Sequence, residues 1–247
     1  MDASVSAATS GPHRQPTDAG ADAMPPIDDA EPRRQVDLKT FGRQFVVPAS
    51  KALGRRARGK LTGRLFEGDD GLFTEAIAGA EVYAEYGCGQ STRWVLEHTA
   101  ATVYAVDTSE DWVAHVRQSD PTGERLHVHW VDVGPLGSWG TPTGFTKREN
   151  FAAYTDWAWD QGVSPDVVLV DGRFRVASFL TSLRRAEPGT TILFDDYRDR
   201  PQYHLVEEFV PVADRCGRQV RFEVPTPGRL DLDAIDALIA QFRLVVA

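Results

Sequence analysis

The segment at residues 82–92 reads Val82-Tyr83-Ala84-Glu85-Tyr86-Gly87-Cys88-Gly89-Gln90-Ser91-Thr92. An apolar run of strand length leads directly into Gly-x-Gly and then into a helical pattern. Glycines at such a turn let the backbone approach a ligand closely, and the first helical turn offers N–H groups that have no intrahelical partner. The segment therefore predicts a strand, a ligand-binding turn and a helix.

Similar apolar runs recur along the chain and alternate with helical patterns, which is typical of βαβ units stacked on a parallel sheet. The predicted strands are Val82–Tyr86, Thr102–Val106, Leu126–Val131, Asp166–Val170, Thr191–Phe194 and Gln219–Val224. The clearest predicted helices cover residues 176–183 and 231–242, where apolar side chains recur at helical spacing. The pattern predicts an α/β fold with a doubly wound, mostly parallel, Rossmann-like sheet and helices on both faces.

The chain divides into three parts by composition. Residues 1–36 contain five of the 15 prolines and no Phe, Tyr, Trp or Leu, so we expect a disordered tail. Residues 37–70 form a basic lead-in, because eight Lys and Arg residues fall between positions 39 and 64 without an acid. Residues 71–247 form the predicted catalytic domain. We expect the basic segment 39–64 to be either a solvated helix or a contact surface for an acidic partner or a membrane surface.

The overall composition excludes several classes of protein. The 247 residues are 42% hydrophobic and carry a formal net charge of −9, which suits a well-cored globular domain and argues against a nucleic-acid partner. Only two cysteines are present, and they are far apart, so a disulfide framework or a structural zinc site is not expected. No apolar run approaches the roughly 20 residues that cross a bilayer. These features predict a cytoplasmic protein without a membrane span.

The ligand of the glycine turn is indicated by two acids. A dinucleotide site favours Gly-x-Gly-x-x-Gly, but the third glycine position is Thr92. Glu85, two residues before Gly87, would repel a pyrophosphate and suits a cationic amino or sulfonium group. Asp107 follows Gly87 by 20 residues, the interval that brings an acid onto a ribose diol.

These residues resemble the class I S-adenosylmethionine-dependent methyltransferases, whose first motif is an acid-x-Gly-x-Gly turn and whose second is the ribose acid. The resemblance covers roughly residues 72–224. It implies that S-adenosylmethionine is the cofactor and that Asp132, after the third strand, and Trp112 contact the adenine. An ordinary loop acid and a core aromatic are the alternatives for these two residues. The predicted cofactor-binding residues are Glu85, Gly87, Cys88, Gly89, Ser91, Asp107, Trp112 and Asp132.

Three further acids follow the fourth and fifth predicted strands: Asp171, Asp195 and Asp196. The carboxyl ends of parallel strands meet at one edge of the sheet, so these carboxylates should converge beside the glycine turn. Clustered carboxylates repel one another unless a cation lies between them, and oxygen ligands in this number suit Mg²⁺, Mn²⁺ or Ca²⁺. Capping of the following loops is the alternative role.

The arrangement is similar to that of metal-dependent O-methyltransferases that act on sugar hydroxyls of antibiotics. The resemblance implies a Mg²⁺ ion held by the three acids and a small-molecule or saccharide acceptor. One departure is the sequence Arg173-Phe174-Arg175, which places two cations near the proposed metal. These arginines either hold an anionic substrate or pair with Asp195 or Asp196 and replace the metal.

The predicted reaction is methyl transfer to a hydroxyl oxygen. Coordination to a metal lowers the pKa of a hydroxyl, and Asp171 or His204 is the candidate base. The alternative for His204 is a surface position. Trp139, Trp157 and Trp159 are candidates for a lid over the acceptor or for a satellite core. A catalytically silent binding or scaffold module is the alternative function.

Overall fold

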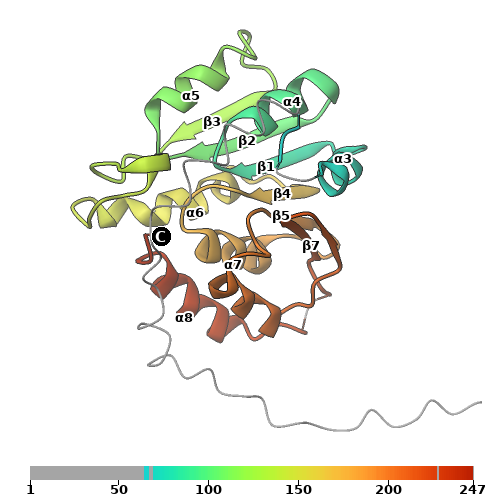
Figure 1. The fold of residues 1–247 in the computed structure, drawn as a ribbon, viewed down its shortest axis with the longest axis vertical. Coiled ribbons are helices and arrows are strands. Elements are labelled where there is room, and N and C mark those ends of the chain that lie inside the picture. Colours follow the sequence, from blue (N-terminus) through green and yellow to red (C-terminus); the bar gives the residue numbers. More distant parts are fainter. Residues whose placement is uncertain (1–63, 67–68, 227, 247) are drawn as a thin grey trace, which may run out of the picture. The chain divides into compact units, whose positions relative to one another are not determined.

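The computed structural model describes residues 64–66, 69–226 and 228–246 (Figure 1). The predicted tail, residues 1–36, and nearly all of the basic segment 39–64 lie outside the described residues. Phe66 is buried in the core, and the side chain of Asp70 accepts hydrogen bonds from the backbone N–H groups of Leu65 and Phe66. Packing of the folded domain is therefore already present just before the predicted boundary at residue 71. None of the helices in the described ranges is long and apolar enough to cross a membrane.

Seven strands form one sheet in the order β3-β2-β1-β4-β5-β7-β6. Six of the seven strands, β1 to β5 and β7, were predicted, and their bounds differ from the prediction by at most one residue at either end. The strands are β1 (Val82–Tyr86), β2 (Thr102–Asp107), β3 (Leu126–Trp130), β4 (Val167–Val170), β5 (Thr191–Phe194), β6 (Asp214–Cys216) and β7 (Gln219–Glu223). Strands β1 to β5 are parallel, and β7 runs antiparallel to β5 and to β6. The predicted mostly parallel, doubly wound sheet is confirmed.

Helices cover both faces of the sheet, as Figure 1 shows. The face that packs against α3, α4 and α5 and the face that packs against α6, α7 and α8 each have their own buried cluster. The helices are α3 (Gly71–Ile77), α4 (Gln90–His98), α5 (Glu110–Arg117), α6 (Phe151–Asp160), α7 (Arg175–Arg185) and α8 (Leu232–Phe242). Three short 3-10 helices complete the described elements: η2 (Ser138–Gly140), η3 (Arg148–Asn150) and η4 (Pro201–Glu208).

Alternation along the central strands explains the two clusters. In β4, Val167 and Leu169 pack into the cluster beside α3 and α4, whereas Val168 and Val170 pack into the cluster beside α7. Successive side chains of a strand point to opposite faces, so a strand covered on both faces reads as a continuous apolar run. This is why the sequence locates the central strands so well.

Strand β6 was not predicted. It is an edge strand whose residues, Asp214-Arg215-Cys216, are exposed or half-buried. A strand at the edge of a sheet needs no apolar run, and charged residues are common there. The sequence signal that reveals a buried strand is therefore absent from it.

Candidate active site

The glycine turn after β1 lies directly against the turn after β4. Gly87 has a positive φ of 94°, and a Cβ at this position would lie 2.6 Å from the Cα of Gly172. A Cβ on Gly172 would in turn collide with the hydroxyl of Tyr154. Around Gly89, by contrast, no heavy atom comes within 4 Å of the place that a Cβ would occupy. Gly87 and Gly172 thus allow two backbone segments to meet, whereas Gly89 borders open space at the predicted cofactor turn.

Glu85 is buried beneath this turn, with 1% of its surface exposed. The hydroxyl of Thr92 donates to Oε2 at 2.7 Å, and the hydroxyl of Ser91 donates to Oε1. The backbone N–H of Gly89 donates to the Thr92 hydroxyl oxygen at 2.8 Å. Burial raises the pKa of Glu85 to about 8, and the two hydroxyl donors oppose this shift. The carboxyl group that was predicted to face a cationic ligand therefore connects β1 to the first turn of α4, and Ser91 is one of its partners.

Asp107, at the end of β2, lies beside the same turn. The backbone N–H of Cys88 donates to its Oδ2 at 3.0 Å, and that of Ser109 donates to its Oδ1 at 2.7 Å. Burial raises the pKa of Asp107, whereas these backbone donors lower it. Burial also raises the pKa of the Cys88 thiol, so this cysteine is inert at neutral pH. The structure thus brings together the predicted glycine turn and the predicted ribose acid.

The loop between β3 and α6 comes close to Asp107. The hydroxyl of Thr108 donates to the carbonyl of Gly140 at 2.7 Å, and the indole N–H of Trp130 donates to the carbonyl of Thr108 at 3.0 Å. Trp139, next to Gly140, has a positive φ of 64° and is 39% exposed. The β3–α6 loop therefore lies along the side of the site next to Asp107, and it carries the exposed indole of Trp139.

The two predicted adenine contacts have other partners. Asp132 is a half-buried acid whose Oδ2 pairs with the ammonium group of Lys147, and its Oδ1 accepts the N–H of Gly134 at 3.0 Å. The Lys147 side chain holds the pKa of Asp132 below its usual value. Trp112, in the first turn of α5, is half-buried and packs edge-on against His115 and against the core cluster beside α4. Trp112 therefore packs against the core, and its contact with an adenine stays a prediction.

The three acids after β4 and β5 do converge, but arginines lie between them. The guanidinium of Arg175 reaches Asp171 Oδ1 at 2.9 Å and Asp196 Oδ2 at 3.2 Å, and it donates to the carbonyl of Asp195 at 2.9 Å. Arg200 contacts the same Asp196 oxygen at 2.6 Å. Of the two possible arginines, Arg175 is therefore the one that pairs with the acids.

Arg218, just before β7, holds the remaining carboxylate oxygens. Its Nη2 lies 2.6 Å from Asp195 Oδ2, its Nε donates to Asp195 Oδ1 at 3.1 Å, and its Nη1 lies 3.1 Å from Asp196 Oδ1. Asp195 is completely buried, and burial together with Asp171 raises its pKa, whereas Arg218 opposes the shift. The paired fork of a guanidinium matches a carboxylate well, so each buried charge here has a partner.

These residues do not fit the predicted Mg²⁺ ion. Both oxygens of Asp195 and of Asp196 contact guanidinium groups, and so does Oδ1 of Asp171. Three cations balance three carboxylates, so the cluster is neutral overall without a metal ion. Among the described residues, no group of three or more His, Cys, Asp or Glu side chains is arranged to hold a metal ion. The metal prediction is therefore not supported, and the alternative of arginine pairing describes the site.

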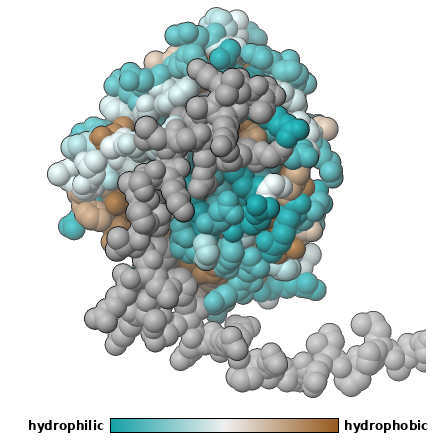
Figure 2. Space-filling model, in the orientation of Figure 1, coloured by the Kyte–Doolittle hydropathy of each residue, from teal (hydrophilic) through white to brown (hydrophobic). Residues whose placement is uncertain are grey.

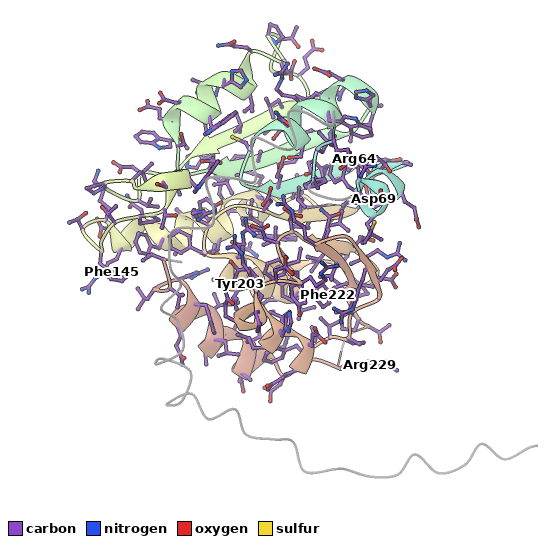
Figure 3. The ribbon with its side chains drawn as sticks, in the orientation of Figure 1. Arg64, Asp69, Phe145, Tyr203, Phe222 and Arg229 are labelled. Atoms are coloured by element: carbon purple, nitrogen blue, oxygen red, sulfur yellow. The ribbon has the colours of Figure 1, made fainter. Side chains whose placement is uncertain are left out.

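His204 lies in η4, the 3-10 helix that follows β5 and the Asp195-Asp196 pair along the chain. Its ring stacks on Tyr197 at a centroid distance of 4.8 Å, and its Nε2 lies 3.3 Å from the Tyr197 carbonyl oxygen. Both contacts are with Tyr197 and neither is with the three acids. They therefore give His204 no role as a base beside Asp171. The neighbouring Tyr203, labelled near the middle of Figure 3, stacks on Phe194 of β5.

Two of the three predicted lid tryptophans belong to the packing of α6. Trp159 is 6% exposed and donates its indole N–H to the hydroxyl of Tyr86 at 2.8 Å. Trp157 stacks on His129 of β3 at 5.3 Å with nearly parallel rings. Both therefore pack with the core cluster beside α6, α7 and α8 rather than in a separate satellite core. The exposed apolar side chains of this region lie in or beside the β3–α6 loop: Trp130, Leu136, Trp139 and Phe145.

Several residues of the site carried no sequence signal. Arg218 and Arg200 surround the acid cluster, Tyr154 accepts a hydrogen bond from the backbone N–H of Arg173 at 2.9 Å, and Lys147 pairs with Asp132. None of them stands in a motif or at a diagnostic spacing. Only the turn of the chain after β5 and the antiparallel return of β7 bring the arginines to the acids.

This chain is similar to a solved structure of a methyltransferase-like protein from Silicibacter pomeroyi DSS-3. It is 31% identical, with a TM-score of 0.61, and the match covers 70% of this chain and 92% of that one. This chain belongs to the methyltransferase-like family.

More distant matches include the N-methyltransferase NodS from Bradyrhizobium japonicum WM9 and an RNA methyltransferase from Salinibacter ruber, each in complex with S-adenosyl-L-homocysteine. NodS is 12% identical with a TM-score of 0.42, and the match covers 76% of this chain and 98% of NodS. The RNA methyltransferase is 17% identical with a TM-score of 0.37, and the match covers 65% and 94%. Both are too distant to assign an acceptor. Comparison with protein-family models and with curated proteins finds no match.

Proposed function

We propose that this chain is an S-adenosylmethionine-dependent methyltransferase that transfers a methyl group to a hydroxyl oxygen of a small molecule or saccharide. The observation that carries the proposal is the hydrogen bond from the Cys88 N–H to Asp107, which ties the glycine turn to the ribose acid. The open space beside Gly89 and the membership in the methyltransferase-like family support it.

The residues of the turn suit this cofactor. Asp107 offers a carboxylate to ribose hydroxyls, and the first turn of α4 has N–H groups directed toward the same edge of the sheet. Glu85 is buried beneath the turn and accepts hydrogen bonds from the hydroxyls of Ser91 and Thr92. These bonds keep the turn in one conformation before a ligand binds. When bound, S-adenosylmethionine supplies a methyl group activated by the sulfonium charge.

We assign Asp171 as the base that takes the proton from the acceptor hydroxyl. It follows β4 at the same edge, its side chain is 32% exposed, and Arg175 holds one of its oxygens at 2.9 Å. The second oxygen is then oriented to accept a hydrogen bond from an acceptor hydroxyl and to take its proton as the oxygen attacks. No metal is needed in this scheme, because arginines already neutralise the acid cluster.

Calorimetry with S-adenosyl-L-homocysteine and with NAD tests the proposal. The wild-type chain should bind the former and not the latter. Gly89→Ala should weaken binding by roughly tenfold or more, because the new methyl group enters the space reserved for the ligand, and stability should change little because no protein atom is near. If the wild-type chain binds no S-adenosyl-L-homocysteine at millimolar concentration, the chain is the silent binding module instead.

The acceptor is found by a second experiment. The enzyme and S-adenosylmethionine with a labelled methyl group are added to cell extract, and labelled metabolites are identified by mass spectrometry. The expected product carries the label on oxygen. A label found on nitrogen or carbon would contradict this part of the proposal and leave the cofactor assignment intact.

A further inference from the structure

Arg173 differs from the other arginines at this edge of the sheet. Arg175, Arg200 and Arg218 each contact a carboxylate, but no carboxylate of the described residues comes within the 4.0 Å ion-pair distance of Arg173. Its Nη1 donates to the neutral hydroxyl of Thr141 at 2.9 Å, and the side chain is half-buried. A guanidinium taken partly out of water without a counter-charge is costly unless a ligand supplies one.

The backbone holds Arg173 firmly in place. On one side Gly172 lies against the Gly87 turn, and on the other Phe174 is 2% exposed and has a positive φ of 50°. Such a conformation is unfavourable for a residue with a Cβ and persists where packing enforces it. Phe174 packs at 4.8 Å against Phe151 of α6, and the Arg173 N–H donates to Tyr154. The start of the Arg173 side chain is therefore fixed rather than free to leave the site.

The surroundings of Arg173 are positive. Burial and the nearby Arg175 lower its pKa, whereas Asp171 opposes this shift. The N-terminus of α7, a helix of 11 residues, begins two residues later, and its first turn has no side-chain cap. Asp107 is close enough for the Arg173 charge to lower its pKa, but its oxygens accept backbone N–H groups instead.

Arg173 also lies between the two parts of the proposed site. Thr141 follows Gly140, whose carbonyl is bound by Thr108 next to Asp107. Asp171, the proposed base, precedes Arg173 by two residues. The guanidinium is thus located between the predicted ribose end of the cofactor site and the place where the acceptor hydroxyl should lie.

We propose that Arg173 binds an anionic group, a carboxylate or a phosphate, that a ligand carries into this site. The inference rests on the proposed function for the identity of the ligands. Two ligands supply that chemistry: the α-carboxylate of the cofactor's methionine part, and an acidic group on the methyl acceptor. Arg173 offers a planar fork to either one, and Thr141 holds the fork in position.

Calorimetry on Arg173→Gln distinguishes the two sources. The probes are S-adenosyl-L-homocysteine, 5′-methylthioadenosine, which lacks the amino-acid part, and inorganic phosphate added to protein saturated with S-adenosyl-L-homocysteine. If the cofactor's carboxylate is bound, the variant loses roughly tenfold or more in affinity for S-adenosyl-L-homocysteine and none for 5′-methylthioadenosine. If an acceptor group is bound, both nucleosides bind as before, and only the phosphate affinity falls by a similar factor.

Two further variants complete the test. Arg173→Lys should recover part of the lost affinity because it keeps the charge, and Arg185→Gln, at the exposed far end of α7, should change no affinity. Equal loss for both nucleosides, or no loss for any probe, would overturn the proposal. If wild-type protein binds neither nucleoside, the proposed function fails, and phosphate titration of the ligand-free wild type against Arg173→Gln still decides the role of Arg173.

Discussion

Glu85 is a carboxyl group that is more stable without its charge. It is fully buried, its partners are two neutral hydroxyls, and its pKa is raised from an ordinary value of 4.5 to about 8. Ionisation in the folded state therefore costs free energy that the unfolded chain does not lose. A cationic ligand above the turn would offset this cost, so that the buried acid links ligand binding to pH.

The raised pKa of Glu85 makes the folded protein less stable as the pH rises toward 8. A group whose pKa is higher in the folded state binds more protons there, so its contribution to the free energy of unfolding falls as pH rises from about 4.5 to 8. The expected slope is at most roughly 1.4 kcal/mol for each pH unit. Glu85→Gln cannot ionise and should remove this part of the pH dependence, which urea denaturation at pH 5, 6, 7 and 8 measures.

The matched control is Glu97→Gln, because Glu97 is an exposed acid on α4 whose salt bridge to Arg93 lies on the surface. This variant should retain the wild-type slope. Identical slopes for wild type and Glu85→Gln would show that Glu85 does not carry the raised pKa.

At the scale of elements, the site depends on the meeting of two strand-to-helix connections. The turn between β1 and α4 contacts the turn between β4 and α7 through Gly87 and Gly172, with the Tyr154 hydroxyl of α6 above them. Backbone atoms cannot move aside as the end of a flexible side chain can. The turns are therefore in contact only because both positions lack a Cβ.

Gly172→Ala should lower the free energy of unfolding by roughly 3 kcal/mol or more, because its methyl group meets the Tyr154 hydroxyl and the backbone of Gly87. Gly89→Ala provides the comparison, since it adds the same methyl group in open space and should change stability by less than about 1 kcal/mol. Chemical denaturation of both variants measures the difference. Equal losses would mean that the two turns can separate at little cost.

At the scale of the whole molecule, charged side chains join the ends of three strands. Asp171 follows β4, Asp195 and Asp196 follow β5, and Arg218 precedes β7, so their ion pairs connect the parallel part of the sheet to its antiparallel edge.

Hydrophilic residues predominate over much of the face in Figure 2, and hydrophobic residues gather at the left edge, where Figure 3 labels Phe145 of the β3–α6 loop.

Because guanidinium groups neutralise these acids, the protein should not respond to metal. Excess EDTA and millimolar Mg²⁺ should each leave the thermal midpoint of the wild type and its binding of S-adenosyl-L-homocysteine unchanged. Arg218→Ala exposes the carboxylates of Asp195 and Asp196 to repulsion and is the variant in which Mg²⁺ should raise the midpoint. Stabilisation of the wild type by Mg²⁺, measured by scanning calorimetry, would contradict the arginine pairing.

Much of the fold was predictable because its signals are local. Both faces of β1, β4 and β5 are buried, so each of these strands appears as an apolar run in the sequence. The helix predicted from residue 231 begins at Leu232, and Asp231 caps it by accepting the N–H of Ala234. The glycine turn and Asp107 could be matched for the same reason: their spacing along the chain reflects one strand, one helix and the next strand.

The sequence by itself thus determined the strands other than β6, the helices α7 and α8, and the placement of the glycine turn beside Asp107 at one edge of the sheet. Only the tertiary structure decided which charges neutralise the acids, because Arg218 stands just before β7, a strand that returns antiparallel from a distant part of the chain. It also decided that Glu85 is buried under the turn and that Arg173 is left without a carboxylate. Spacing predicts where a residue leaves the sheet, whereas the partner of a charge depends on every segment that packs around it.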